Sequence, residues 1–239
     1  MVDMHFVKWL WNCVLDILFP ITCVKCGKEN EWVCRPCAES IPIELEDSCA
    51  VCKKYSYDGK TCYECKKICA LSGVVRFFNY DSRLAQKTLQ IVKYGYVAEA
   101  LMPLLNVLDA HIVSKFEKLG LDPRAIIFVP VPLHPRRLRE RGFNQSLIIA
   151  DYFAQVTGGT VAEVLARRWT RPPQVFLDED DRVRNIKGNF KCLDPEAVQG
   201  KYIFLVDDVT TTGSTLNECA LTLQSAHPLD IWGIVLAKG

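Results

Sequence analysis

Four CxxC pairs lie within residues 23–65, and no other feature of the sequence restricts the fold so strongly. Each CxxC turn directs two thiolates to one point, and two such turns complete a tetrahedral site of four sulfurs that suits zinc. Neither predicted site has a histidine or an open position, so we expect two structural zinc ions. Paired in sequential order, the predicted ligands are Cys23, Cys26, Cys34 and Cys37 for one ion and Cys49, Cys52, Cys62 and Cys65 for the other.

Other arrangements of these cysteines fit the same spacing. A crossed pairing of the CxxC turns, or Cys69 in place of one ligand, is compatible with it. A disulfide scaffold is a further alternative, but it is typical of small secreted domains, and nothing else in the sequence indicates secretion. A segment of this size buries too little apolar surface to fold alone, so the metals supply the missing free energy of folding.

The distribution of cysteines also predicts two domains. Ten of the 12 cysteines lie between Cys13 and Cys69, which puts a boundary near residues 71–74. We therefore expect an N-terminal helix and a double zinc ribbon over residues 1–72, and a second domain over residues 73–239.

Residues 1–22 contain an apolar run, Trp9–Phe19, that is interrupted by Asn12 and Asp16. A bilayer-spanning helix needs about 20 apolar residues, so this run is too short. Lys8 alone precedes it as a basic residue and no small-residue cleavage site follows, which disfavours a signal peptide. We expect an amphipathic helix that packs on its own protein, with contact of residues 1–20 with a membrane surface or a partner as the alternative. The net charge of +1 predicts no particular partner, and we expect a cytoplasmic protein.

From Gly73 onward, apolar strands alternate with amphipathic helices, a pattern typical of an α/β fold whose parallel sheet is covered by helices on both faces. Ligands of such sheets bind beyond the carboxyl ends of the strands. The predicted strands are 74–80, 125–132, 201–209 and 229–239, and the predicted helices are 84–95, 99–120, 144–159 and 214–226.

The stretch IFLVDDVTTTGST, residues 203–215, places two adjacent carboxylates, Asp207 and Asp208, after a buried strand. Their repulsion is costly unless cations or hydroxyl groups lie beside them. The hydroxyl-rich loop that follows is predicted to begin a helix, whose N-terminus favours an anion. A phosphate joined to a sugar diol fits this pattern, because the diol suits the two carboxylates and the phosphate suits the loop. The predicted loop residues are Thr210, Thr211, Thr212, Gly213, Ser214 and Thr215.

This 13-residue pattern resembles the phosphoribosyl pyrophosphate (PRPP) signature of type I phosphoribosyltransferases. The resemblance implies that Asp207 and Asp208 hold the ribose hydroxyls and that residues 211–215 hold the 5′-phosphate. It also implies that the segment VPVPLHPRR, residues 129–137, supplies the pyrophosphate loop, and that magnesium bridges pyrophosphate and ribose oxygens. From that segment the expected PRPP-binding residues are Val131, Pro132, Leu133 and His134.

Over nearly its whole length the chain resembles the competence ComF (ComFC/GntX-like) family. The resemblance rests on LFP-x2-CxxCG at 18–27, the later cysteine pairs, KYG at 93–95, VPVPLHPRRLRERGFNQ at 129–145, Gln174, Arg182 and Asn185, together with VDDVTTTGST. This family is associated with natural transformation, the inward passage of single-stranded DNA. The resemblance therefore implies single-stranded DNA and a competence helicase as partners, beside PRPP.

Basic residues follow the proline-rich turn at close spacing, and a second group covers residues 167–187 with aromatic residues between them. Arginine suits pyrophosphate and backbone phosphates alike. Some of these arginines have an alternative role as ion-pair partners of the acidic run 178–181. His134 is a candidate base, but a histidine in a turn is more often a hydrogen-bonding group. The candidates for phosphate or nucleic-acid binding are Arg136, Arg137, Arg139, Arg141, Asn144, Gln145 and Arg182.

Two functions fit these patterns. The first is a binding protein with a PRPP site that acts in competence and DNA uptake by handling single-stranded DNA. The second is an active, magnesium-dependent phosphoribosyltransferase, which stabilises the leaving pyrophosphate by charge and needs no protein nucleophile. No segment for its base or amine acceptor, and no catalytic residue, is identified by the sequence.

Overall fold

A computed structural model describes residues 20–43, 45, 48–79, 82–167 and 188–238, and a five-stranded parallel sheet forms its centre. The strand order is β1-β7-β6-β2-β3, and every neighbouring pair is parallel. The strands are β1 (Gly73–Asn79), β2 (Ile126–Pro130), β3 (Thr160–Val161), β6 (Tyr202–Thr210) and β7 (Asp230–Lys238). A separate antiparallel pair consists of β4 (Leu165–Arg167) and β5 (Phe190–Cys192).

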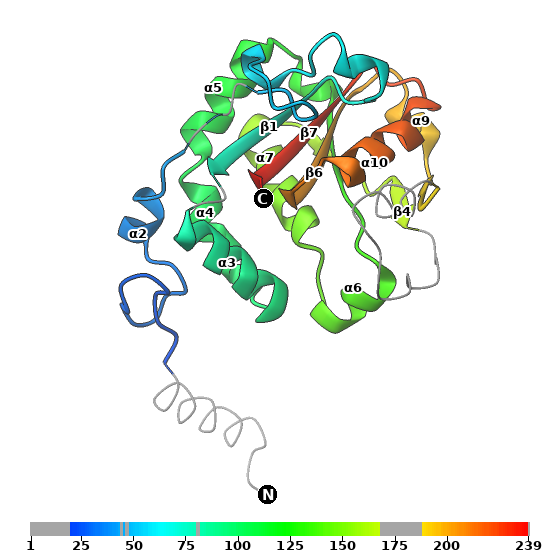
Figure 1. The fold of residues 1–239 in the computed structure, drawn as a ribbon. Coiled ribbons are helices and arrows are strands. Elements are labelled where there is room, and N and C mark those ends of the chain that lie inside the picture. The colour runs from blue at the N-terminus through cyan, green and yellow to red at the C-terminus, as the bar shows by residue number, and fades with distance from the viewer. Residues whose placement is uncertain (1–19, 44, 46–47, 80–81, 168–187, 239) are drawn as a thin grey trace, which may run out of the picture.

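Helices cover both faces of the sheet, as Figure 1 shows for α3 to α5 on one side and α10 on the other. The longer helices are α3 (Arg83–Tyr94), α5 (Asp109–Leu119), α6 (Pro135–Arg141), α7 (Gln145–Thr157) and α10 (Ser214–Gln224). The shorter ones are α2 (Arg35–Glu39), α4 (Met102–Asn106), α9 (Pro195–Val198) and the 3-10 turns Tyr57–Gly59, Cys65–Lys67, Ala98–Leu101 and Pro123–Ala125. The predicted α/β class is therefore confirmed.

Alternate residues of the central strands enter two separate buried clusters, because successive side chains of a strand point to opposite faces. Phe204 packs with α3, α4, α5 and α7 on one face, whereas its neighbours Ile203 and Leu205 pack with α10 on the other. All three side chains are fully buried. This two-sided burial explains the continuous apolar runs of the strands.

The prediction of a single helix over residues 99–120 is wrong. The structure has the 3-10 turn Ala98–Leu101, then α4, then α5, which begins at Asp109. Pro103 lies in the first turn of α4, where its missing N–H costs nothing, but inside a continuous helix it would remove a hydrogen bond and clash with the preceding turn. The proline therefore accounts for the start of a new helix at α4.

The cysteine-rich segment packs directly on the sheet. Cys23, Cys34 and Cys37 belong to the same buried cluster as Phe78 of β1. Farther along the segment, the buried Arg76 of β1 donates from Nη2 to the carbonyl oxygen of Ser48 at 2.8 Å.

A second buried cation, Lys115 of α5, lies 3.1 Å from a carboxylate oxygen of Asp58. Hydrogen bonds and ion pairs of this kind satisfy charges that would be costly to bury alone. The second domain is predicted to begin at residue 73, and β1 begins there. The domain boundary itself stays a prediction, because buried contacts cross it.

Among the helices that the structure describes, none is long and apolar enough to span a membrane. The predicted N-terminal helix and its membrane or partner contact fall on residues 1–19, outside the described residues.

Candidate functional site

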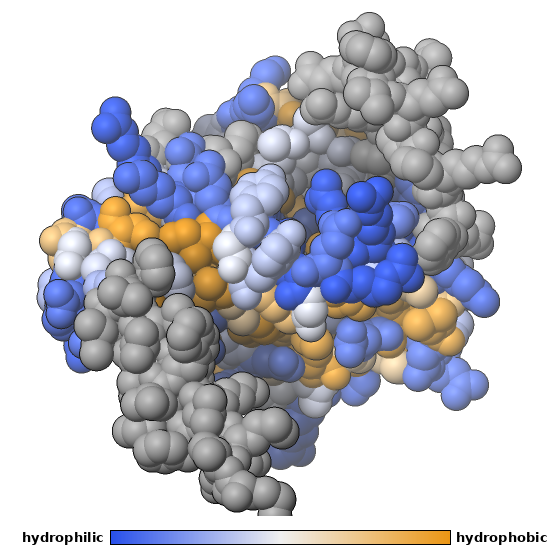
Figure 2. Space-filling view, turned by 90° about the horizontal axis from the view of Figure 1, so that it is seen from below, coloured by the Kyte–Doolittle hydropathy of each residue, from blue (hydrophilic) through white to orange (hydrophobic). Residues whose placement is uncertain are grey.

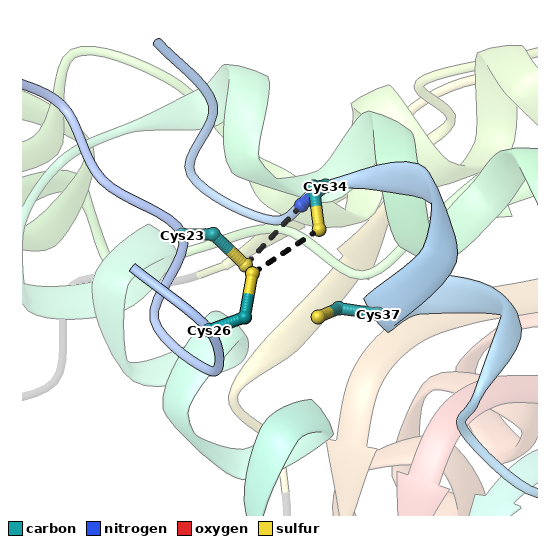
Figure 3. Close-up of side chains that lie close together, drawn as sticks. All are labelled: Cys23, Cys26, Cys34 and Cys37. Carbon is teal, nitrogen blue, oxygen red and sulfur yellow. Dashed lines mark hydrogen bonds between the residues drawn. The ribbon is translucent and has the colours of Figure 1, made fainter. Parts of the chain in front are cut away.

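The eight predicted zinc ligands form two groups, paired in sequential order. Within each group all four sulfur atoms lie within 4.8 Å of one another. The Sγ atoms of Cys26 and Cys34 are 3.6 Å apart, and those of Cys52 and Cys62 are also 3.6 Å apart. Four sulfurs at about 2.3 Å from a tetrahedral zinc ion would be separated by about 3.8 Å, so both groups fit zinc. Figure 3 shows the first group, with sulfurs from two chain segments pointing toward one another.

Hydrogen bonds in the first group favour a bound cation. Burial acts to raise the pKa of Cys23, but backbone N–H groups, that of Cys34 foremost, outweigh it and lower the pKa to about 6. The neighbouring thiol of Cys34 in turn raises the pKa of Cys37 to about 12. Four thiols at one point cannot all ionise without a positive ion between them, and zinc supplies that charge. Cys69 belongs to neither group.

A second site lies at the carboxyl ends of β2 and β6, where a cleft of about 320 Å³ opens. Figure 2 views the molecule from this end and shows strongly hydrophilic side chains gathered beside residues of intermediate hydropathy. Of the residues predicted to bind PRPP or phosphate, those that line the cleft are Val131, Pro132, Leu133, Arg137, Arg141, Gln145, Asp207, Asp208 and Thr215.

The two adjacent aspartates have different partners within the cleft. Oδ1 of Asp207 accepts hydrogen bonds from Oγ of Ser146 at 3.0 Å and from the backbone N–H of Asp208 at 2.9 Å. Oδ2 of Asp208 lies 3.1 Å from Nζ of Lys93, and its Oδ1 accepts from the N–H of Val209. A hydroxyl group and a cation therefore stabilise the carboxylate pair, as their adjacency requires.

The pKa of Asp207 is raised to about 7. The main cause is the enclosure of its carboxyl group among protein atoms, and the charge of Asp208 adds to it. The opposing contributions of Lys93 and the Ser146 hydroxyl are smaller. Asp207 thus gains or loses its proton near neutral pH, whereas an ordinary aspartate is ionised from about pH 4 upward.

This raised pKa predicts that replacing Asp207 with asparagine stabilises the protein at high pH. Between about pH 4 and 7 the folded chain keeps a proton that the unfolded chain has lost, so the free energy of unfolding falls as the pH rises through this window. Asparagine retains an oxygen for the hydrogen bonds from Ser146 and Asp208 but carries no charge. We expect Asp207→Asn to melt at a higher temperature than the parent at pH 8, with the difference shrinking toward pH 5.

Thermal unfolding at both pH values checks this prediction, with the exposed Asp151→Asn as the control. An equal effect of the two variants, or a lower melting temperature for Asp207→Asn at pH 8, would contradict it.

The hydroxyl-rich loop is shorter than predicted. Thr210 is the last residue of β6 rather than the first of the loop, and α10 begins at Ser214. Gly213 adopts a φ of 75°, a left-handed conformation that favours glycine, and its N–H donates to Oγ1 of Thr210 at 3.0 Å. Thr211, Thr212 and Ser214 lie in or next to this turn, and Thr215 lines the cleft. Their phosphate-binding role stays a prediction.

The proline-rich turn leads into α6, and two predicted binding residues cap helices there. Nδ1 of His134 accepts from the N–H of Arg136 at 3.2 Å, at the start of α6. Asn144 accepts from the N–H of Ser146 at the start of α7, and its amide donates to the carbonyl oxygen of Val131 at 3.1 Å. These contacts give His134 and Asn144 structural roles, and neither residue lines the cleft.

Three arginines line the cleft: Arg137, Arg141 and Arg167. Arg141 donates from Nη1 to Oε1 of the buried Gln145, and its Nε has no hydrogen-bond partner among the described residues. Partial burial lowers the pKa of Arg141, whereas the charge of Asp208 acts in the opposite direction. A guanidinium group with a free buried donor at a cleft wall suits an anionic ligand.

The other candidate arginines lie away from the cleft or outside the described residues. Arg136 pairs with Glu140 at 2.8 Å on the exposed face of α6. Arg139 is exposed on the same helix. Arg182, Gln174, Asn185 and the acidic run 178–181 fall outside the described residues.

Lys93, Tyr94, Tyr96 and Glu140 also line the cleft, although the sequence assigned them no role there. The sequence contained part of the information needed to place them there, because Lys93 and Tyr94 belong to the KYG motif at residues 93–95. The helical pattern of residues 84–95 did not show that the end of α3 reaches the aspartates.

Several known proteins are similar to this chain in sequence or in structure. Residues 14–66 match the double zinc ribbon domain. The chain is 29% identical over 223 residues to DNA utilization protein YhgH of Escherichia coli K12, covering 84% of this chain and 94% of that protein. It is 22% identical to competence protein ComFC of Bacillus subtilis, over 82% and 79% of the two chains. Competence protein F of Haemophilus influenzae is 32% identical over 48% of this chain and 51% of its own.

Among solved structures, the glutamine PRPP amidotransferase of Bacillus subtilis aligns with 62% of this chain and 30% of its own, at 17% identity and a TM-score of 0.38. Because this score is low, the fold class rests on the sheet topology described above. The chain is a homologue of the proteins named YhgH, ComFC and competence protein F, and it carries an N-terminal double zinc ribbon domain with two four-cysteine zinc sites.

Proposed function

We propose that the cleft binds PRPP with magnesium and that the protein acts in natural competence and DNA uptake by handling single-stranded DNA. The observation that carries the first part is the composition of the cleft. Three carboxylates, three guanidinium groups, one lysine and Thr215, in the first turn of α10, line one cavity. A sugar that bears a phosphate and a pyrophosphate needs this combination of hydrogen-bond acceptors and positive charge.

Each part of PRPP is assigned to a separate wall of the cleft. Asp207 and Asp208 accept hydrogen bonds from the ribose hydroxyls, and the loop at residues 211–215 binds the 5′-phosphate. Residues 131–133 and the guanidinium groups of Arg137 and Arg141 bind the pyrophosphate. The free Nε of Arg141 supports this assignment, because a buried donor without a partner is costly until a ligand accepts from it.

Magnesium fits the donor set of the cleft. It prefers oxygen ligands and retains several waters, and it is commonly held by one or two carboxylates together with ligand phosphates. Asp207 is the better protein ligand of the pair, because Oδ2 of Asp208 is already 3.1 Å from Lys93. When bound with PRPP, the ion supplies positive charge to the pyrophosphate oxygens.

The role in DNA handling is supported by the named homologues and by the arginines of α6. Arg137 and Arg141 face the cleft, whereas Arg139 is exposed outside it. We propose that Arg139 contacts the backbone of a single strand that passes the mouth of the cleft, and that a competence helicase delivers or receives this strand in the cytoplasm. Contacts to phosphates release counterions, so the binding must weaken as salt increases.

Measurements of oligonucleotide binding distinguish the proposed role of Arg139 from that of Arg141. We expect Arg139→Ala to weaken binding of a single-stranded oligonucleotide and to reduce the slope of log affinity against log salt by about 0.7, the value for one lost phosphate contact. PRPP affinity should be unchanged in this variant, whereas Arg141→Ala should weaken both ligands. Fluorescence anisotropy over a salt series measures the slope, and Arg124→Ala, at the opposite end of β2, is the matched control. Binding that is independent of salt, or equal in all the variants, would contradict the proposed DNA contact.

A second candidate is an active phosphoribosyltransferase on a base or amine acceptor. The pKa of Asp207, raised to about 7, favours it, because a group that titrates near neutral pH can exchange a proton during a reaction. Incubation with PRPP, magnesium and mixed bases should then release pyrophosphate only when an acceptor is present. Binding of PRPP without acceptor-dependent release would leave the binding protein as the function.

A further inference from the structure

A groove of about 780 Å³ opens between α2, which carries the zinc ligand Cys37, and α4. The two helices lie side by side, as Figure 1 shows, and none of the described residues lines both this groove and the cleft at β2 and β6. Its apolar lining residues are Trp32, Val33, Ile43, Met102, Pro103 and Val107. Met102 is 40% exposed, whereas Trp32 and Val107 also pack against the main buried cluster. An apolar groove on the surface is typical of a place where another segment or protein binds.

The described part of the chain begins beside this groove. The carbonyl oxygen of Ile21 accepts a hydrogen bond from the N–H of Asn30 at 2.7 Å. Asn30 directly precedes Glu31 and Trp32, which line the groove. Three extended residues span at most about 11 Å, so a segment that ends at position 18 is tethered within that distance of Ile21. The connection is therefore long enough for residues 1–19 to reach the groove without any change in the described fold.

The sequence of residues 8–19 predicts a helix with one apolar face. Lys8, Asn12 and Asp16 recur every four positions, so a helix places them on one side. The period of 3.6 residues places only apolar residues on the opposite side, namely Leu10, Cys13, Val14, Ile17 and Leu18. A helix this short is marginally stable alone in water and gains most of its stability by packing its apolar face. The same i, i+3, i+4, i+7 spacing is the one with which amphipathic helices bind apolar grooves.

We propose that residues 8–19 dock as a helix in this groove, with the apolar face of the helix against Met102 and Val107. The tether favours the chain's own segment over other occupants, because a short connection gives it an effective concentration in the millimolar range. A second copy of the chain at micromolar concentration competes poorly with a segment held in this way. The docked helix joins the first zinc site to α4 through a third element. This inference does not depend on PRPP binding, since the cleft lies apart from the groove.

Amide hydrogen exchange of the full-length, zinc-loaded protein, followed by mass spectrometry, tests the docking. We expect residues 8–19 of the parent to exchange at least about tenfold more slowly than an unstructured chain, because exchange requires the docked segment to open. Met102→Glu places a charge in the groove and should remove this protection. Val113→Glu is the matched control, because Val113 is 41% exposed on α5 and lies outside the groove.

A change in the segment itself should have the same effect from the other side of the contact. Val14→Glu places a charge on the apolar face of the predicted helix, so residues 8–19 should lose their protection. The amides of residues 99–107, in the wall of the groove, should then exchange faster as well. Asn12→Glu adds the same charge to the polar face and should leave both regions protected. Zinc content and melting temperature verify that every variant is folded.

Each outcome supports or overturns the docking. Protection at all protein concentrations that is lost in Met102→Glu and Val14→Glu, but not in their controls, supports it. Unprotected residues 8–19 in the parent, or protection that persists in Met102→Glu, overturns it. Protection that disappears on dilution, in a protein whose mass by light scattering is that of a dimer, assigns the groove to a second copy and overturns docking within one chain. Protection that appears only with vesicles of phosphatidylethanolamine and phosphatidylglycerol assigns the segment to a membrane surface and also overturns it.

Discussion

Replacing Asp207 and Asp208 together with asparagine is expected to reduce PRPP affinity by at least about a hundredfold. Each carboxylate is assigned a charge-assisted hydrogen bond to a ribose hydroxyl, worth about 1.5–3 kcal/mol, and two such losses correspond to this factor or more. The double variant should remain folded, because asparagine at position 207 keeps an acceptor for Ser146 and asparagine at position 208 keeps one for the N–H of Val209. Calorimetric titration with PRPP and magnesium measures the change.

Asp151→Asn/Glu163→Gln is a matched control, since it removes the same charge from two exposed positions. It should bind PRPP as the parent does. If the cleft variant also retained parental affinity, the aspartates would have no part in PRPP recognition and the assignment of the loop would be wrong.

Loss of the first zinc ion is expected to destabilise the whole chain, because Cys23, Cys34 and Cys37 are part of the main buried cluster. Structural zinc contributes about 10–16 kcal/mol of apparent binding free energy in isolated finger peptides. A third of that free energy is about 3–5 kcal/mol. For a chain of this size each kcal/mol changes the melting temperature by about 2–4 °C, so we expect a fall of about 10 °C. We expect Cys34→Ser to show this fall and to hold one zinc ion per chain, where the parent holds two.

Metal analysis and thermal unfolding of the purified variants check this prediction, with Cys69→Ser as the control. Cys69 lies outside both groups of sulfur atoms, so its variant should keep two zinc ions. Two zinc ions in Cys34→Ser, or one in Cys69→Ser, would contradict the ligand sets that the structure defines.

Local patterns were sufficient to predict much of this molecule. The CxxC spacing predicted both groups of zinc ligands, because each turn brings its two sulfurs together whatever the rest of the fold does. The apolar run before Asp207 predicted a buried parallel strand, and the structure places the carboxylates near the end of β6. In both cases the determining interactions lie within a few residues of one another in the sequence.

The features that the sequence did not predict depend on distant contacts. Lys93 reaches Asp208 because the end of α3 borders the cleft, and nothing in the amphipathic pattern of α3 indicates that contact. The buried contact of Arg76 with Ser48 likewise depends on how the zinc ribbon packs against β1.

One error has a local cause. The apolar pattern of residues 99–120 concealed the effect of Pro103, which begins a new helix. Asn144 has a structural role that the sequence also allowed, because asparagine is a preferred residue at the start of a helix and it caps α7. Its part in phosphate or nucleic-acid binding stays a prediction.

The central claim is that the cleft at the carboxyl ends of β2 and β6 binds PRPP. The most direct test is a calorimetric titration of the zinc-loaded parent protein with PRPP, with and without magnesium. We predict saturable binding of one PRPP per chain, strengthened by magnesium. No measurable binding under either condition would contradict the claim, and the function would then have to rest on nucleic-acid and partner contacts alone.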